Sequence, residues 1–182
     1  MEIPRTLDGN QWIELLERIA SHLAPEAPPV TLCLIGSSAC LFAGMDARTS
    51  RDLDIWRPLS DYDRKELREA AEAAGVLFDP RSALDPDRPY LQIVDPGVVE
   101  IGDFEPIRID RIGRLILLRP PVENLIASKL IRGDSRDVSD ILFLVNHFNP
   151  DLEEVRKIVL GFSSSNRDKA VENLVYLDLI AP

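Results

Sequence analysis

The sequence contains no long hydrophobic run. No apolar stretch approaches the roughly 20 residues that a helix needs to cross a bilayer. The first ten residues, MEIPRTLDGN, have neither the basic start nor the apolar stretch of a signal peptide. We therefore expect a cytoplasmic protein with no membrane partner. Because 45% of the residues are hydrophobic, the chain can still bury a core, which excludes wholesale disorder.

Cysteine and histidine are scarce as well. The two cysteines, Cys33 and Cys40, lie seven residues apart, which is not a zinc-ligand spacing, and only His22 and His147 exist to help them. This scarcity argues against a structural zinc site. Both cysteines sit inside apolar runs, so we expect them to be reduced and buried.

Basic residues are in the minority. The chain has 21 Lys and Arg against 31 Asp and Glu, which gives a formal net charge of −10 and an isoelectric point near 4.7. Binding of nucleic acid through its phosphates needs clustered Lys and Arg. The composition therefore argues against a broad basic surface that binds nucleic acid. It is compatible with a basic protein partner. Four arginines on or directly after two expected strands could form a local basic patch or a solvated sheet face: Arg108, Arg111, Arg114 and Arg119.

Hydrophobic periodicity predicts alternating helices and strands. Apolar residues recur at helical spacing over residues 9–23, and short apolar or alternating runs predict six strands, at 30–35, 52–56, 90–94, 98–104, 106–110 and 114–118. Further helices are expected at 36–44, at about 61–74 with Ser60 and Asp63 as a capping box, and at 122–131, 136–148, 151–161 and 166–179.

This element order predicts an α/β (α+β) fold, with a mixed sheet, flanking helices and a helical C-terminal part. No Gly/Ser-rich linker separates the parts, so we expect residues 1–182 to form one domain. Its core would cover about residues 30–145, and its helical extension about residues 151–179.

One stretch contains residues typical of a nucleotide site. A buried strand runs into Gly36-Ser37, and after fourteen intervening residues comes Asp52-Leu53-Asp54. Gly36 can adopt a positive φ and lets the backbone approach a ligand closely. Ser37 and the N–H groups that follow could bind an anion. Asp52 and Asp54 are two apart on a strand, so both carboxylates leave one face, where a cation would offset their repulsion. A phosphate cradle facing two carboxylates suits Mg²⁺-assisted nucleotidyl transfer.

These residues resemble the minimal nucleotidyltransferase superfamily, which has the polymerase-beta-like fold. Ile35-Gly36-Ser37 and Asp52-Leu53-Asp54-Ile55 match its signature. Arg48-Thr49-Ser50, before the acid pair, resembles the R-x-S-x-D-x-D motif of the branch related to abortive-infection AbiE-type toxins. A second block resembles the same branch, with P-x-x-L-I-x-x-K-L over 121–130 and R-D-x-x-D over 136–140.

The resemblance implies a role for each matching residue. Gly36 and Ser37 would hold the nucleotide phosphates, and Asp52 and Asp54 would bind Mg²⁺. Lys129 would reach the triphosphate or the leaving pyrophosphate. Arg48 would orient the phosphates or the strand.

Active members of that superfamily use a third carboxylate on a later strand, to complete the metal site or to act as general base. The candidates in this sequence are Glu100, Asp103 and Asp110. Glu100 fits best, because apolar residues flank it.

Ordinary structural roles remain open for several of these residues. Lys129 could be a solvent-facing residue, and Asp137 could merely support the start of its helix. Asp140 could form an exposed helical pair with Arg136. Arg48 could pair with Asp46 or Asp52.

The first hypothesis for function is therefore a Mg²⁺-dependent transferase that moves a nucleoside monophosphate from an NTP to a hydroxyl of a protein or RNA, such as tRNA. The resemblance implies a toxin–antitoxin or phage-defence setting, with a cognate toxin or antitoxin as partner. The second hypothesis is a non-catalytic binding protein that retains the fold, such as an antitoxin or scaffold. A weaker third is a small-molecule transferase of the aminoglycoside-modifying type.

Overall fold

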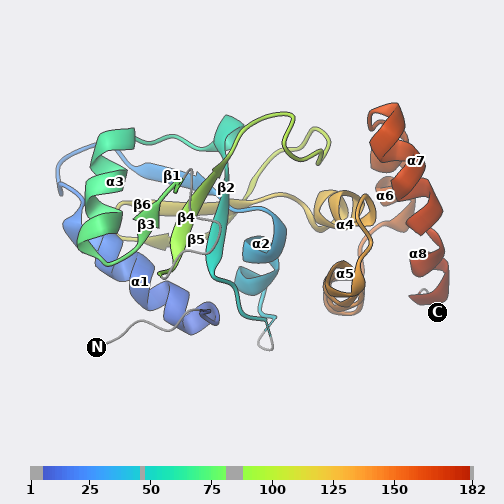
Figure 1. Cartoon of the computed structure of the whole chain (residues 1–182), viewed down its shortest axis with the longest axis horizontal. Coiled ribbons are helices and arrows are strands. Elements are labelled where there is room, and N and C mark those ends of the chain that lie inside the picture. The colour runs from blue at the N-terminus through green and yellow to red at the C-terminus, as the bar shows by residue number, and fades with distance from the viewer. Residues whose placement is uncertain (1–5, 46–47, 81–87, 181–182) are drawn as a thin grey trace. The chain divides into compact units, whose positions relative to one another are not determined.

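We analysed a computed structural model, which describes residues 6–45, 48–80 and 88–180 (Figure 1). The chain divides into two compact units. Unit 1 comprises residues 1–95 and 106–119, and unit 2 comprises residues 96–105 and 120–182. Compact units do not by themselves make separate domains, so the single domain stays a prediction.

Unit 1 carries the strands. Its described part contains two three-stranded sheets, with strand orders β1-β6-β5 and β2-β4-β3, and the first sheet is mixed while the second is parallel. Together with the helices, these sheets confirm the α+β class. The elements of unit 1 are α1 (Gly9–His22), β1 (Val30–Cys33), α2 (Gly36–Phe42), β2 (Asp52–Trp56), the 3-10 turn η1 (Arg57–Leu59), α3 (Arg64–Ala73), β3 (Leu77–Phe78), β4 (Tyr90–Val94), β5 (Ile107–Ile112) and β6 (Leu115–Arg119).

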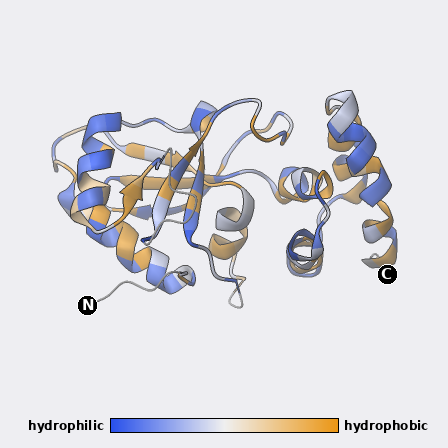
Figure 2. Cartoon of the chain, viewed as in Figure 1, coloured by the Kyte–Doolittle hydropathy of each residue, from blue (hydrophilic) through white to orange (hydrophobic). Residues whose placement is uncertain are grey.

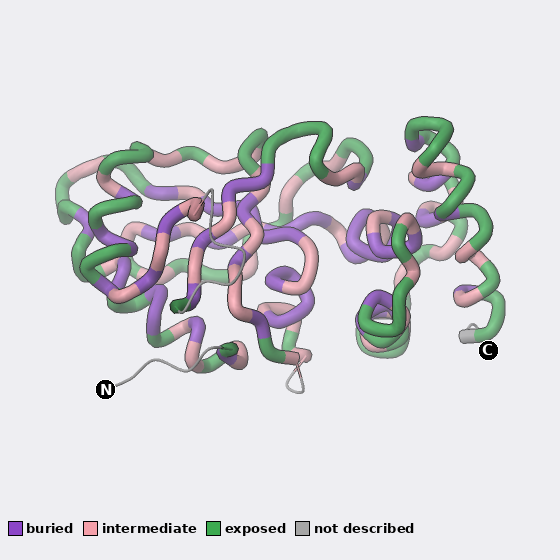
Figure 3. Tube along the Cα trace, viewed as in Figure 1, coloured by how far each residue is buried: buried purple, intermediate pink, exposed green. Residues whose placement is uncertain are grey.

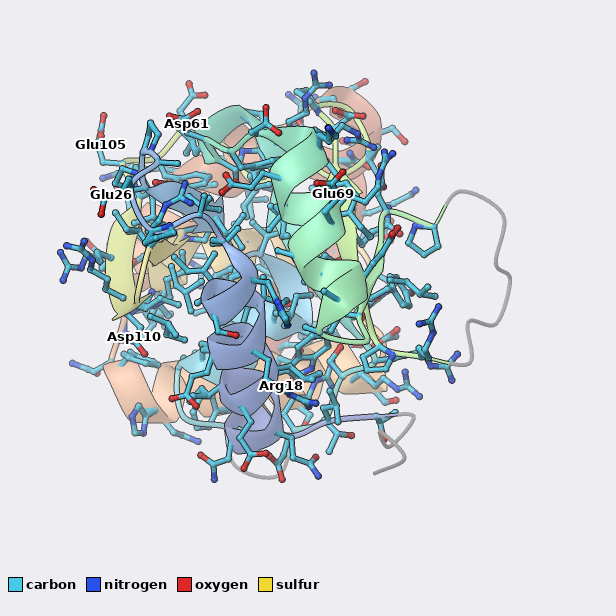
Figure 4. The ribbon with its side chains drawn as sticks, turned by 90° about the vertical axis from the view of Figure 1, so that its left-hand side faces the viewer. Arg18, Glu26, Asp61, Glu69, Glu105 and Asp110 are labelled. Atoms are coloured by element: carbon cyan, nitrogen blue, oxygen red, sulfur yellow. The ribbon has the colours of Figure 1, made fainter. Side chains whose placement is uncertain are left out.

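Helices α1 and α3 pack side by side in unit 1 (Figure 4). Helix α1 begins with a capping box, in which Asp8 and Gln11 satisfy each other's backbone N–H groups. Its apolar face is buried, and Figure 2 shows hydrophobic and hydrophilic residues interspersed along it. The exposed Arg18 of α1 and Glu69 of α3 point outward (Figure 4). The periodicity that predicted α1 therefore also predicted its buried face.

In the sheet with strand order β2-β4-β3, side chains along β2 and β4 alternate between two faces, one of which is buried. Leu53 and Ile55 of β2 and Leu91 and Ile93 of β4 are buried in the core (Figure 3). Successive side chains of a strand point to opposite faces, so the intervening residues of both strands share the other face. Asp52, Asp54, Tyr90 and Gln92 on that face are polar and half-buried, whereas Trp56 and the buried Val94 at its other end are apolar.

The two cysteines are buried and form no disulfide, as the sequence predicted. Burial raises the pKa of the Cys33 thiol to about 12, because a thiolate is disfavoured away from water. Since the thiolate is the reactive form, we expect Cys33 to resist an aromatic disulfide reagent in the native protein and to react in denaturant. Spectrophotometric thiol counting checks this expectation. Fast labelling of Cys33 in the native chain, located by peptide mass, would contradict it.

Unit 2 consists of helices and the segment 96–105. The helices are α4 (Val122–Leu130), α5 (Ser135–Phe148), α6 (Leu152–Leu160), α7 (Ser164–Asn173) and α8 (Val175–Ile180). Helix α4 packs against α5, α6 and α7, so it is the centre of the unit. In the part of the chain that the structure describes, no helix is long and apolar enough to cross a membrane.

Two predicted helices differ from the structure in their bounds. The helix expected from residue 61 begins at Arg64 with Asp63 as its N-cap, because Ser60 instead bonds to the backbone of Cys33 and Trp56. The helix expected at 166–179 is two helices, α7 and α8.

The strand predicted at 98–104 is wrong, because no part of this segment forms a strand. The side-chain amide of Asn124 donates to the backbone carbonyls of Ile101 (2.8 Å) and Asp103 (3.2 Å). Val98 is 71% exposed, so the apolar alternation of the segment does not define a buried face. Side-chain hydrogen bonds therefore satisfy carbonyls that a strand would have paired in a ladder.

Candidate functional site

Asp52 and Asp54 lie on the polar face of β2, as their spacing predicted. Both side chains are half-buried. Strand β4 runs parallel to β2, with Tyr90 in register with Asp52 and Gln92 in register with Asp54. The four side chains therefore share one face of the sheet, and two of the four are carboxylates.

The carboxylate of Asp52 is held on both sides. Ser50 Oγ donates to its Oδ1 at 2.8 Å, and Tyr90 Oη donates to its Oδ2 at 3.0 Å. Burial, followed by the negative charge of Asp52, raises the pKa of Tyr90 to about 12. The phenol thus remains a protonated donor over the working range of a protein.

The turn between β1 and α2 brings the backbone against Asp54. The Ile35 N–H donates to the Asp54 carbonyl at 3.0 Å, and Gly36 has a φ of +59°. A Cβ atom at Gly36 would lie 3.1 Å from Asp54 Oδ2, tighter than ordinary contact. Glycine is therefore required here both by its backbone angle and by the nearby carboxylate.

The buried Ser38 fastens helix α2 to strand β2. Its hydroxyl accepts from the Asp54 N–H at 2.9 Å and donates to the Asp52 carbonyl at 3.5 Å. The backbone of both acidic residues is thus tied to α2.

Arg48 brings a positive charge to the same turn. Its guanidinium donates to Ser37 Oγ at 2.5 Å, so the two expected phosphate-binding side chains lie together in unit 1. Asp46, one of the partners considered for Arg48, lies outside the described residues.

Gln92 has its amide oriented by a chain of contacts. Its Nε2 donates to Asp79 Oδ1 at 3.1 Å, and the other oxygen of Asp79 pairs with Arg64. The residue in register with Asp54 on β4 is thus a neutral amide. The third acid that the sequence resemblance implies does not stand at this position.

Glu100, the favoured third acid, belongs to unit 2. Its carboxylate accepts from the N–H and hydroxyl of Ser163 (2.7 and 2.8 Å) and from the amide of Asn166 (2.8 Å). Burial opposes its ionisation, but these hydrogen bonds outweigh burial and hold the pKa of Glu100 below its usual value. The carboxylate thus joins the segment 96–105 to the start of α7, and its catalytic role stays a prediction.

The other two candidates for the third acid are exposed. Asp103 accepts the Asn124 amide through its backbone carbonyl, and Asp110 lies on β5, where its side chain accepts from the Arg111 N–H at 2.6 Å. Figure 4 shows Asp110 directed outward.

Lys129 is buried in unit 2, so the solvent-facing alternative was wrong. It is only 6% exposed, and its ammonium lies 2.5 Å from Asp140 Oδ2 and 3.5 Å from Asp137 Oδ1. Arg132 completes the cluster with a bond of 2.6 Å to Asp137 Oδ2.

The two acids of this cluster are not surface residues. Asp137 does more than support a helix start, because it pairs with Lys129 and Arg132. Asp140 is fully buried, so the alternative of an exposed helical pair with Arg136 was wrong. The four charges connect α4 with α5. The nucleotide-binding role of Lys129 stays a prediction.

The four arginines considered for a basic patch or a solvated sheet face differ in burial. Arg114 bonds to Glu66 and to the carbonyls of Ala24 and Pro28, which fastens the linker after α1, and Arg119 is 9% exposed. Arg108 and Arg111 of β5 are exposed. Of the four arginines, Arg119 is therefore buried and Arg114 is held at the linker after α1.

Sequence reasoning missed four residues of this site: Ser38, Ser50, Tyr90 and Gln92. Ser50 stands two residues before Asp52, and Tyr90 and Gln92 alternate with apolar residues, which was the available signal. Pairing β4 with β2 could not be read from that alternation, because strand pairing is a non-local property.

The donor set in unit 1 suits a hard cation. Two half-buried carboxylates on one strand, with backbone so close that a Cβ would crowd one of them, match the one or two carboxylates that Mg²⁺ takes from a protein before phosphates and water complete its shell. Among residues 6–45, 48–80 and 88–180, no three His, Cys, Asp or Glu side chains gather as metal ligands. No known protein family, curated protein or solved structure matches the chain.

Proposed function

We propose that unit 1 binds a Mg²⁺–NTP complex and transfers the nucleoside monophosphate to a hydroxyl of a protein or RNA, releasing pyrophosphate. One observation carries the proposal: Asp52 and Asp54 share the polar face of β2, with the Gly36 turn against the second carboxylate. Two carboxylates on one face repel each other, and a divalent cation between them removes that cost.

Mg²⁺ at this pair would bind phosphate oxygens and neutralise the charge that develops as the phosphoryl group moves. The chain's own residues would do the positioning. Ser37 Oγ and the Arg48 guanidinium lie together at the turn and can donate hydrogen bonds to phosphate oxygens. In the reaction, the acceptor oxygen would bond to the α-phosphorus, the bond from phosphorus to the pyrophosphate oxygen would break, and the hydroxyl proton would be lost to a base.

A second candidate function is that of a non-catalytic binding protein which retains the fold, such as an antitoxin or scaffold. Gln92 favours it, because this neutral amide stands beside Asp54 where an acid could have taken the acceptor's proton. Glu100 also favours it, since its carboxylate is engaged by Ser163 and Asn166. In either case a cognate toxin or antitoxin is the partner that the sequence resemblance suggests.

The test is calorimetric titration of the full chain with each NTP, with Mg²⁺ and with a chelator. We expect at least one NTP to bind only with Mg²⁺, because the triphosphate and the carboxylates are both anionic and need the cation between them. Absence of binding by every NTP, or equal binding in chelator, would contradict the proposal.

Incubation with the bound NTP labelled at the α-phosphate then separates the two candidates. Label transferred to protein or tRNA, with release of pyrophosphate, supports the transferase. If no label is transferred to any acceptor, the transferase is contradicted and the non-catalytic protein is favoured.

A further inference from the structure

Both carboxylate oxygens of Asp52 accept a hydrogen bond from a neutral hydroxyl, Ser50 Oγ on Oδ1 and Tyr90 Oη on Oδ2. From this geometry we infer that Ser50 and Tyr90 are positioning residues, which hold the Asp52 carboxylate in the orientation that binds the metal. The inference rests on the proposed function, because it concerns the same metal site.

Ser50 delivers its hydroxyl from a fixed point of the chain. Its N–H and carbonyl both bond to the backbone of Leu7 at 2.9 Å, and the indole N–H of Trp12 donates to the same carbonyl at 3.2 Å. Ser50 is 8% exposed, and Leu7 and Trp12 belong to the core. The hydroxyl therefore has a rigid support in α1 and the segment before it.

Tyr90 reaches Asp52 from the neighbouring strand. The two residues are in register in the parallel β2–β4 ladder, so their side chains leave the same face beside each other. A phenol on a paired strand has few rotatable bonds, and the ladder fixes where it starts. Asp52 is thus held from two directions, by a residue just before its own strand and by a residue of the neighbouring strand.

The chemistry of the two donors matters as much as their positions. A carboxylate offers about four lone-pair sites, so one hydrogen bond on each oxygen leaves sites for a cation. Neither hydroxyl carries a charge, and the negative charge of Asp52 is not cancelled by these partners. Asp140 of unit 2 shows the contrast, since its carboxylate pairs with the ammonium of Lys129. Neutral donors orient a ligand while leaving its attraction for a metal intact.

Binding of Mn²⁺ to the full chain tests this inference, with free Mn²⁺ measured by electron paramagnetic resonance. The variants are Tyr90→Phe and Ser50→Ala, which each remove one hydroxyl, and Tyr62→Phe, which removes a hydroxyl from a half-buried ring packed edge-on against Phe78. Binding retained by a variant with Asp52→Asn and Asp54→Asn is subtracted as background. Partners of metal ligands typically contribute 10- to 100-fold in affinity, so we expect a loss of about 10-fold or more for Tyr90→Phe and for Ser50→Ala, and none for Tyr62→Phe.

The outcomes separate the inference from the proposed function. If the wild type binds Mn²⁺ and both variants bind it equally well, the positioning role is overturned and the metal site stands. If the wild type binds no Mn²⁺ above background, the positioning role is overturned, and the calorimetric NTP titration decides the proposed function separately. A purely structural role for either hydroxyl would lower the melting temperature without changing Mn²⁺ affinity, so thermal melts by circular dichroism accompany each titration. If Tyr90→Phe fails to fold, Ser50→Ala decides.

Discussion

Replacing Asp140 with Asn is expected to destabilise unit 2 by about 3–5 kcal/mol, the usual cost of breaking a buried ion pair from one side. Asp140 is fully buried, and its carboxylate lies 2.5 Å from the ammonium of Lys129, which is itself only 6% exposed. The variant would leave Lys129 with Asp137 alone, at 3.5 Å, and that carboxylate is already shared with Arg132. A buried ammonium with an incomplete counter-charge is costly because nothing replaces its lost hydration.

Urea unfolding followed by two signals measures this effect. Both tryptophans, Trp12 and Trp56, lie in unit 1, so their fluorescence reports that unit, whereas circular dichroism also reports the helices of unit 2. We expect the variant to shift the circular dichroism transition to lower urea. A fluorescence transition that stays in place would localise the loss to unit 2.

Two control variants show whether the effect comes from burial. Glu154→Gln breaks the exposed pair with Lys157, where both side chains are about half-exposed or more, and is expected to change stability by less than about 1 kcal/mol. Lys129→Met combined with Asp140→Leu removes the buried pair entirely and is expected to cost less than Asp140→Asn alone. An Asp140→Asn protein as stable as the wild type would show that the pair contributes nothing.

Lys129 illustrates what the sequence could not predict. Its helix alternates too little to define one face, since the residues from Val122 to Leu130 are mostly buried. The partner that makes burial of a lysine tolerable, Asp140, is eleven residues away on another helix. Hydrophobic periodicity reports which residues avoid water, and it carries no information on charges that pair across helices.

The strand that bears the acid pair shows the opposite case. Asp52–Trp56 alternates polar and apolar residues, and the structure gives the predicted bounds and burial pattern. The segment around Glu100 has similar alternation but forms only an isolated bridge, between Pro96 and Val99, and Asn124 bonds to the carbonyls of Ile101 and Asp103. Alternation is a local property, whereas pairing requires a second strand, so only the structure distinguished the two segments. The same limit hid Tyr90 and Gln92.

Replacing Asp52 and Asp54 together with Asn is expected to weaken Mg²⁺-dependent NTP binding by more than about 100-fold, which is roughly 2.7 kcal/mol. The substitutions keep the shape of both side chains and leave the backbone bonds to Ser38 in place, but they remove the two anionic ligands. Like charges on one strand face repel, so their removal is expected to leave the melting temperature near that of the wild type or to raise it.

A matched control separates the metal site from overall charge. Asp95→Asn combined with Glu17→Gln removes the same charge from exposed positions of unit 1 and is expected to leave NTP binding unchanged. Calorimetric titration and thermal melts on both double variants give the comparison. A fall in melting temperature of many degrees for the Asp52 and Asp54 variant would mean that the pair stabilises the fold through its bonds with Ser50 and Tyr90. Retained binding in a stable variant would place the nucleotide elsewhere. Only loss of binding at an unchanged or higher melting temperature fits carboxylates that are kept together, against their repulsion, for a cation.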